Sequence, residues 1–317
     1  MIPRHVASHW RAIVARSGGL DAGHQPLEAP RGRLSTACQI ALAKTRWLRR
    51  WMWARRATAA LFLLLLISAH FEWLGWLKGS TASTRVLGWF WLADPMAALE
   101  VVLASRTLHQ ELAIAALLLV VLYALLGRVF CGWVCPLGLV LDLNDDARDR
   151  LNRWLVKRGR RLPEVHIARR VKYVFLALVL ILSLASSLPV FQLISPINIL
   201  SRAMIFGIGW EWLLVLVIVA LDYSSRRVWC RAICPLGAFY SLIGMFGRIR
   251  VLIDQEKEQG QRGCGLCAMR CPMGIRVQSD YVRMDKRSVD EIECTRCGAC
   301  VDPCPRSSLR LGIKLSR

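Results

Sequence analysis

Acidic residues are scarce in this chain. Its 317 residues include 22 Asp and Glu against 43 Lys and Arg, which gives a formal net charge of +21 at pH 7. Such a balance can indicate nucleic-acid binding. Here, however, the basic residues flank long apolar runs, and anionic lipid next to such runs accounts for a basic excess. We therefore expect no nucleic acid as a partner.

Charge is nearly absent from several long stretches of the sequence. Hydrophobic residues make up 55% of the chain, which is more than a soluble domain usually contains. A helix crosses ~30 Å of hydrocarbon with ~20 mostly apolar residues. Four runs approach that length: 57–76, 112–127, 173–193 and 203–221. The second and fourth are short or interrupted. The expected fold is a membrane α-helical protein with four transmembrane helices.

Lys and Arg are missing from all four runs, and their distribution between the runs predicts the orientation. The segments before 57, from 128 to 172 and after 222 hold 11, 11 and 17 of them, whereas the other two connections hold 3 and 1. Cytoplasmic segments carry the excess of positive charge. We therefore expect a multi-pass protein of the bacterial inner (cytoplasmic) membrane with both termini in the cytoplasm.

Histidine is also scarce. The chain has six, and only His70 lies within an expected span. A haem held inside the bilayer needs axial ligands there, which are usually His. With no second intramembrane His, a membrane b-type cytochrome is not expected.

Cysteine, in contrast, is abundant. Of the 12 cysteines, all except Cys38 fall into short clusters that the charge pattern assigns to the cytoplasmic side. Disulfides do not persist in that compartment, so regularly spaced cysteines there indicate metal ligands or redox groups. Cys38 lies alone in a region rich in Arg, Gly, Pro and Ser. We expect residues 1–46 to form a flexible basic cytoplasmic arm and Cys38 to have no role.

The run CTRCGACVDPCP is the strongest motif in the chain. It contains Cys294, Cys297, Cys300 and Cys304, followed by a proline. This is the C-x2-C-x2-C-x3-C-P spacing of bacterial ferredoxins, in which the first three cysteines hold one [4Fe-4S] cluster and the fourth ligates the other. Zinc sites instead use two separated pairs of ligands. The motif therefore predicts iron bound through these thiolates.

An earlier run, QRGCGLCAMRCP, supplies three more cysteines but has Gln261 where a first cysteine would stand. Crossed ligation assigns one complete cluster to Cys294, Cys297, Cys300 and Cys271. It leaves a second cluster with Cys264, Cys267 and Cys304. Two alternatives are open for the second cluster: a [3Fe-4S] cluster, or a [4Fe-4S] cluster whose last iron is held by water or another side chain. Residues 250–317 are expected to form a cytoplasmic two-cluster ferredoxin-like domain.

The same cysteine motif occurs twice, in RVFCGWVCPLG from Arg128 and in RVWCRAICPLG from Arg227. Each segment follows an expected span, so we expect the two to meet at the cytoplasmic face. The cysteines concerned are Cys131, Cys135, Cys230 and Cys234. One interpretation is that the prolines end helices and the cysteines fill space. The favoured hypothesis is a redox or metal station, either a further iron-sulfur cluster, which takes four thiolates, or a dithiol-disulfide relay.

With these runs and motifs, the sequence resembles the NapH/MauN family of membrane ferredoxin-type proteins. The resemblance covers roughly residues 50–313 and includes DPMAALEVVLAS, LYALLGRVFCGWVCPLG, SPINILSRAMIFGIG and WCRAICPLGAFYSLIG. Residues 47–249 would then be the four-helix membrane domain with two CxxxCP motifs. The family implies a quinol dehydrogenase component that draws on the membrane quinone pool. The family implies that this component passes electrons, through a periplasmic ferredoxin-type subunit, toward a periplasmic oxidoreductase of nitrate reductase type or a c-type cytochrome.

The resemblance leaves a second function open. This is an accessory or maturation role of MauN type, for a periplasmic redox enzyme such as methylamine dehydrogenase, or a role in metal-reducing assembly. Gln261 departs from the NapH pattern, since NapH-type members carry a complete first ferredoxin motif. For quinol chemistry, ionisable residues near the outer ends of the spans are the candidates. They are His70, Glu72, Asp94, Glu100, His109, Arg202 and Glu211.

Overall fold

The structure is a computed structural model that describes most of the chain from residue 50 onward. The described residues are 50–70, 77–79, 83–86, 90–107, 110–160, 167–206, 209–223, 225–258, 265–304 and 307–314. The expected basic arm at 1–46, with Cys38, lies outside the described residues. Gln261 and Cys264 lie outside them as well.

Helices form most of the described chain up to residue 246. In chain order they are α3 (Arg50–His70), α4 (Pro95–Ser105), α5 (Gln110–Leu126), α6 (Phe130–Trp133), α7 (Pro136–Lys157), α8 (Val171–Ser186), α9 (Val190–Ile194), α10 (Pro196–Phe206), α11 (Trp212–Asp222), η2 (Trp229–Ile233), α12 (Pro235–Ile243) and η3 (Gly244–Phe246). Between α3 and α4 lies an antiparallel sheet of β1 (Leu77–Gly79), β2 (Ser83–Val86) and β3 (Phe90–Ala93). The sequence did not predict this sheet.

The C-terminal part is built on a second antiparallel sheet with the strand order β5-β4-β6. Its strands are β4 (Ile249–Ile253), β5 (Ser288–Val289) and β6 (Leu309–Ile313). Val251 of the central strand pairs with Val289 on one side and Leu311 on the other. The connections contain the short helices α13 (Gln255–Glu258), α14 (Leu266–Arg270) and η4 (Gln278–Val282). This sheet and the turns around it form the ferredoxin-like part.

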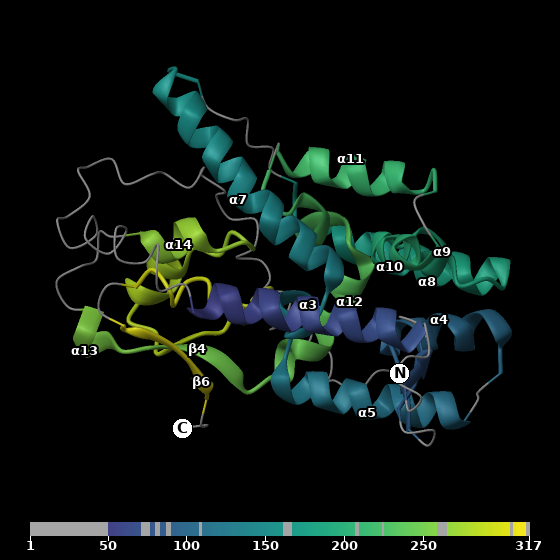
Figure 1. The fold of residues 1–317 in the computed structure, drawn as a ribbon. Helices are drawn as coiled ribbons and strands as arrows, with labels where there is room; N and C mark the ends of the chain where they lie inside the picture. Colours follow the sequence, from purple (N-terminus) through teal and green to yellow (C-terminus); the bar gives the residue numbers. More distant parts are fainter. Residues whose placement is uncertain are drawn as a thin grey trace.

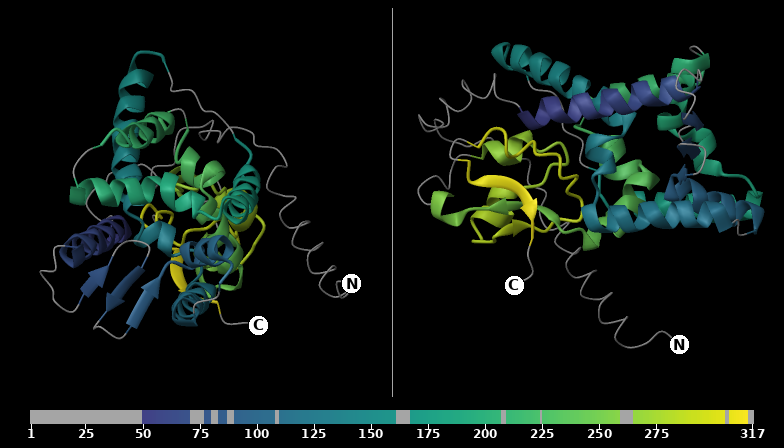
Figure 2. Two further views of the ribbon diagram at one scale, coloured as in Figure 1. Left: turned by 90° about the vertical axis from the view of Figure 1, so that its right-hand side faces the viewer. Right: turned by 60° about the horizontal axis from the view of Figure 1, so that its bottom comes forward.

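The helical part and the ferredoxin-like part occupy opposite ends of the molecule (Figure 1). Helices α4, α5, α8, α9 and α10 reach toward one end, and the yellow C-terminal strands lie at the other. The right view of Figure 2 shows the same separation, and the left view shows β1, β2 and β3 standing beside the helices. Helix α3 connects the two ends, because the backbone N–H groups of Trp51 and Met52 each donate to the Asp302 carboxylate at 3.2 Å.

The prediction of four transmembrane helices is not confirmed. Within the described ranges, no helix combines the length and the apolar character needed to cross a membrane. Helices α5 and α8 have 17 and 16 residues. At ~1.5 Å per residue each is about 25 Å long, against ~30 Å of hydrocarbon. Helix α3 has 21 residues, but Arg50, Arg55 and Arg56 lie in its first two turns.

Breaks in the backbone account for the difference in two of the four runs. The run 173–193 leaves the helical conformation after Ser186, because Ser187 is left-handed with a φ of 53° and Pro189 cannot donate a helical hydrogen bond. The chain then resumes in α9. The run 203–221 is divided between α10, which ends at Phe206, and α11, which begins at Trp212. Mean hydropathy does not register such breaks.

The two repeated cysteine segments fold alike. The first cysteine of each pair lies in a short helical turn, α6 or the π-helical turn η2. The second cysteine, Cys135 or Cys234, is the N-cap of the next helix, α7 or α12, and a proline occupies the first turn. Proline fits there because the first N–H groups of a helix have no intrahelical partner. The prolines therefore begin helices and do not merely end them.

Candidate functional site

The four cysteines of the repeated segments meet in the core of the helical part. Cys135 and Cys234 are buried members of this core, and Cys131 and Cys230 pack against it. Besides burial, the proximity of Cys131 raises the pKa of each of the other three thiols. The structure thus brings together the two pairs that the sequence predicted to meet. We call this group the CxxxCP site.

Burial of the CxxxCP site disfavours free thiolates. Burial raises the pKa of the Cys230 thiol to about 12 and that of Cys234 to about 11. A dithiol relay needs an accessible thiol with a lowered pKa, so this environment argues against it. Bound iron would supply the positive charge that keeps four buried thiolates together, and four thiolates are the ligand set of a [4Fe-4S] cluster. The residues therefore fit such a cluster.

A second group of four cysteines matches the crossed ligand set. Besides burial, the nearby Cys297 and Cys271 raise the pKa of Cys294, and Cys294, Cys271, Cys297 and Cys267 raise that of Cys300. Cys271 caps the end of α14, and the other three lie on the loop after β5. Burial raises the pKa of the Cys294 thiol to about 12. These residues also fit a [4Fe-4S] cluster, and we call them the Cys271 site.

The ligands expected for the incomplete cluster are only partly described. A charge on Cys267 acts on Cys300, and Cys304 Sγ lies 3.0 Å from Ser308 Oγ. Cys264 is outside the described residues, so this ligand set stays a prediction. Among the residues that the structure does describe, no three His, Cys, Asp or Glu side chains are placed to hold a single ion. A cubane does not need such convergence, because each of its irons takes its own thiolate.

A buried ion-pair network lies between the two described cysteine sites. Arg128 Nη1 lies 2.7 Å from Glu293 Oε2, and each side chain is 1% exposed. Lys172 pairs with the same carboxylate oxygen, and the Tyr173 hydroxyl donates to Oε1 at 3.0 Å. Burial alone would raise the pKa of Glu293, but Arg128 and Lys172 together lower it. The sequence motif included Arg128 without assigning it a role. The available signal was that Arg stands three residues before the first cysteine in both repeats.

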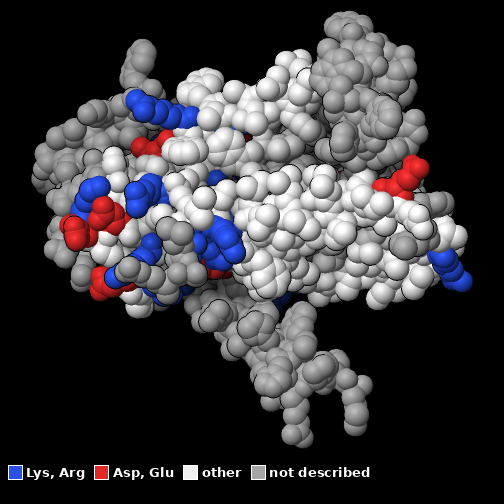
Figure 3. Space-filling model, turned by 90° about the horizontal axis from the view of Figure 1, so that it is seen from below, with Lys and Arg blue, Asp and Glu red and all other residues white. Residues whose placement is uncertain are grey.

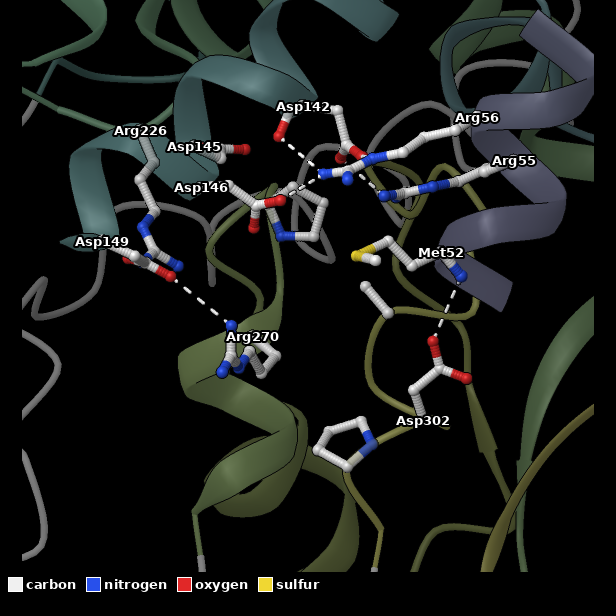
Figure 4. Close-up of a pocket in the computed structure, with 13 residues that line it drawn as sticks. Met52, Arg55, Arg56, Asp142, Asp145, Asp146, Asp149, Arg226, Arg270 and Asp302 are labelled. Carbon is white, nitrogen blue, oxygen red and sulfur yellow. Dashed lines mark hydrogen bonds and ion pairs between the residues drawn. The ribbon is translucent and has the colours of Figure 1, made fainter. Parts of the chain in front are cut away.

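A charged pocket of about 80 Å³ separates α3 and α7 from the ferredoxin-like part (Figure 4). On one side, Asp142 accepts hydrogen bonds from Arg55 at 2.5 Å and from Arg56 at 2.8 Å. On the other side, Asp149 pairs with Arg226 and, at 3.4 Å, with Arg270 of α14. Figure 4 shows these groups pointing at one another across the pocket. The Asp142 pairs join α7 to α3 within the helical part, and the Asp149–Arg270 pair joins α7 to the ferredoxin-like part.

The ionisable residues suggested for quinol chemistry are scattered. Tyr240 Oη donates to Asp94 Oδ1 at 2.6 Å, and the Tyr240 ring lies 5.2 Å from that of Phe130, the neighbour of Cys131. Glu100 is fully buried, and its Oε1 accepts a hydrogen bond from the Phe191 N–H at 3.0 Å. Arg202 and Glu211 form an exposed ion pair of 3.0 Å. The side chains of His70, Glu72 and His109 lie outside the described part of the chain. Among the four candidates whose side chains the structure describes, Asp94 alone is linked to the CxxxCP site, through Tyr240 and Phe130.

Known protein families match both cysteine regions. Residues 108–162 and 208–253 match the family described as a 4Fe-4S binding domain. Each of these matches contains one CxxxCP pair. Residues 262–309 match the family described as a 4Fe-4S dicluster domain, which covers the ferredoxin motif. No solved structure matches the chain.

Several curated relatives match over most of their length. The ferredoxin-type protein NapH of Escherichia coli is 32% identical over 86% of this chain and 93% of that protein. NapH of Haemophilus influenzae is 31% identical over 84% and 90%, respectively. The methylamine utilization ferredoxin-type protein MauN of Paracoccus denitrificans is 31% identical over 73% and 80%. With its 4Fe-4S domains and this extent of similarity, the chain belongs to the NapH/MauN family of ferredoxin-type proteins.

Proposed function

We propose that the protein carries electrons from membrane quinol, through iron-sulfur clusters, toward a periplasmic oxidoreductase of the nitrate reductase type. One observation carries the proposal: two buried cysteine sites lie in one molecule that also exposes a wide apolar surface. A ferredoxin that diffuses in water has no use for such a surface. The protein is then the quinol dehydrogenase component of a larger system and not a stand-alone enzyme.

The apolar surface lies on consecutive turns of α5, α8 and α11. On α5, Ile114, Leu117 and Val121 are 69%, 62% and 51% exposed, and on α8 Val174 and Ile181 are 68% and 64% exposed. Figure 3 shows most of the Lys, Arg, Asp and Glu over the ferredoxin-like end, a broad uncharged surface over the helices, and a few charged side chains at the far end. Surfaces of this kind contact lipid or another protein. The proposed contact is the lipid of a bacterial inner membrane, with the basic chain ends on its cytoplasmic side.

Oxidation of quinol releases protons as well as electrons. Iron-sulfur clusters take up one electron at a time, which suits the stepwise oxidation of a quinol. The proton acceptor in this chain is the Asp94 carboxylate, and the Tyr240 hydroxyl relays a proton to it: Tyr240 passes its own proton to Asp94 as it takes one from quinol. The Asp94 carboxylate is half-buried, and the hydroxyl of buried Tyr240 donates to it at 2.6 Å. Tyr240 also packs on Phe130 beside the CxxxCP site. The pair can therefore receive a proton next to the electron acceptor and release it at the surface.

Quinol-driven reduction of the purified full-length protein in lipid nanodiscs tests the proposal. Iron and acid-labile sulfide are measured first, to establish the cluster load. A short-chain menaquinol analogue or ubiquinol should then bleach the visible absorption of the wild type. Asp94→Asn should slow the bleaching severalfold at unchanged iron content. Glu211→Gln is the control, because Glu211 is an exposed carboxylate paired with Arg202. A fully loaded protein that dithionite reduces and neither quinol reduces contradicts the proposal.

Membrane location is tested independently of quinol. The full chain should stay with the inner-membrane fraction after a carbonate wash, because lipid would cover the apolar faces of α5, α8 and α11. A reporter fused after Arg317 should be active only on the cytoplasmic side. Recovery of the protein in the wash, or a periplasmic reporter, would contradict the proposed location.

The proposed electron acceptor is a periplasmic ferredoxin-type subunit or a c-type cytochrome. A second candidate function, maturation of a periplasmic redox enzyme, is favoured by relatives named for methylamine utilization that match at a similar identity. Deletion of the gene distinguishes the two functions. Loss of an electron conduit leaves the partner enzyme active with an artificial donor such as a reduced viologen. Loss of a maturation factor leaves it inactive with any donor.

A further inference from the structure

The CxxxCP site and the Cys271 site touch each other through their backbones. Gly132 follows Cys131 in α6 and faces the loop that holds Cys297. A Cβ atom added to Gly132 would lie 2.7 Å from the Thr295 carbonyl oxygen and 3.5 Å from Cys297 Cβ. The first distance is shorter than real Cβ contacts. Gly132 therefore allows a close approach that any larger residue would prevent.

A buried arginine connects the same two sites. Arg128 Nη2 donates to the Cys230 carbonyl oxygen at 3.3 Å, and the Arg128 charge interacts with the thiols of Cys131 and Cys230. Its Nη1 lies 2.7 Å from the carboxylate of Glu293, the residue before Cys294. One side chain thus contacts both the CxxxCP site and the first residue of the ferredoxin loop.

A second arginine fixes the ferredoxin loop to the helical part. Arg296 lies between Cys294 and Cys297, and its Nη2 donates to the Gly244 carbonyl oxygen at 3.0 Å. Its own carbonyl oxygen accepts a hydrogen bond from Trp133 Nε1 at 3.1 Å. Arg296 is 4% exposed. The loop is therefore held from both sides of the Gly132 contact.

We propose that the two sites are consecutive stations of one intramolecular electron path, joined at the contact of Gly132 with Thr295 and Cys297, and that Arg128 and Glu293 are its positioning residues. The proposal rests on the proposed function, because it requires a cluster at the CxxxCP site. In each step one electron leaves one site and enters the other. The site that gives up the electron is oxidised as the other site is reduced, and no bond is formed or broken and no proton is transferred. The ferredoxin-like part then works as a fixed station and not as a mobile carrier.

The positioning charges should also tune the sites. Adding an electron to a cluster is easier next to a positive charge and harder next to a negative one. Arg128→Met should therefore lower the reduction potential of the CxxxCP site, and Glu293→Gln should raise the potential of the Cys271 site. Arg128→Lys should restore most of the wild-type potential. A residue that only supported the fold would not shift the potentials in opposite directions according to its charge.

The contact itself is tested with Gly132→Ala in the full-length protein. Gly209→Ala is the matched control, because a Cβ there meets no atom within 4 Å. Both sites are reduced chemically with dithionite, so that the test does not depend on quinol. EPR then measures the magnetic interaction between the two reduced clusters. Wild type and Gly209→Ala should show the interaction, and Gly132→Ala should weaken it severalfold with unchanged iron.

For the charge variants the control is Arg148→Met. Arg148 is also buried, but it donates to the Tyr223 carbonyl oxygen at 3.2 Å.

The outcomes separate this inference from the proposed function. Full iron content with the same EPR interaction in Gly132→Ala and Gly209→Ala would overturn the path at this contact and leave the proposed function standing. Equal iron content in wild type and Cys131→Ser would mean that the CxxxCP site holds no cluster, which would overturn both. Lack of quinol reactivity, with the interaction present and sensitive to Gly132, would overturn only the quinol proposal and support the path.

Discussion

The guanidinium of Arg227 lies 2.7 Å from the carboxylate of Asp142. Arg227 stands in the second repeated segment where Arg128 stands in the first, and Arg55 and Arg56 of α3 bind the same carboxylate. Burial alone would raise the pKa of Asp142, but the three arginines hold it below its usual value. One carboxylate thus joins α3, α7 and the second segment.

Asp142→Asn should destabilise the protein strongly. The change leaves three largely buried guanidinium groups without their common anion, and removing one partner of a buried pair costs about 3–5 kcal/mol. Asp254→Asn is the control, because Asp254 pairs with Lys257 at a site where the two side chains are 36% and 56% exposed. Exposed pairs contribute little to stability. Urea unfolding followed by circular dichroism measures both variants, and similar losses in the two would contradict the role of Asp142.

The Asp142 contribution should also depend on pH. A carboxyl whose pKa is lowered in the folded state stabilises the fold at pH values above its unfolded pKa of ~3.9, and this stabilisation is lost as the pH falls through the folded value. The unfolding free energy of the wild type should therefore fall on acidification below about pH 4. Asp142→Asn should show a shallower fall over the same range. Parallel pH profiles for the two proteins would rule out this contribution.

Single Cys→Ser changes should separate the cysteine sites by iron content. Replacing Cys131, Cys135, Cys230 or Cys234 should remove about four iron atoms, the content of one [4Fe-4S] cluster. Replacing Cys271 should remove a different cluster, with a different EPR signal. Cys38→Ser is the control and should change nothing. Retention of all iron in the four CxxxCP variants would show that these cysteines only fill space.

Gln261 should determine the type of the incomplete cluster. If Cys264, Cys267 and Cys304 are its only protein ligands, the oxidised wild type should show the EPR signal of a three-iron cluster, because cluster type follows the ligand set. Gln261→Cys should abolish that signal and should add a fourth iron to this cluster. Gln261→Ser is the matched control and should leave the signal in place. An oxidised wild type with iron for complete cubanes and no such signal would point to another fourth ligand.

The sequence predicted the sites whose ligands are set by residue spacing, and it predicted less well the contacts that depend on how distant segments pack. The repeat of Cys131 and Cys135 at Cys230 and Cys234 predicted that the pairs meet, because equivalent segments of a repeat occupy equivalent places. The partner of Arg128 could not be predicted, since Glu293 is 165 residues away. Two of the expected spans are divided for a local reason that mean hydropathy does not register: the run 173–193 leaves the helix at the left-handed Ser187, and the run 203–221 is split between α10 and α11.

The Arg296 side chain lies directly over the backbone of Gly127. Gly127 has a φ of 86°, and a Cβ there would lie 1.0 Å from Arg296 Nη1. Gly159 has a similar φ of 73°, but a Cβ there meets no atom within 4 Å. The two glycines therefore separate the cost of backbone strain from the cost of displacing a buried arginine.

Gly127→Ala should destabilise the protein more than Gly159→Ala. Left-handed strain costs each variant about 1–2 kcal/mol. In Gly127→Ala, Arg296 must also leave its place, which loses a charged hydrogen bond worth about 1.5–3 kcal/mol. Urea unfolding measures both changes, first in the wild type and then in an Arg296→Ala background. In that background the obstruction is gone, so Gly127→Ala should cost only the strain. An equal cost in both backgrounds would show that the contact with Arg296 does not limit residue 127.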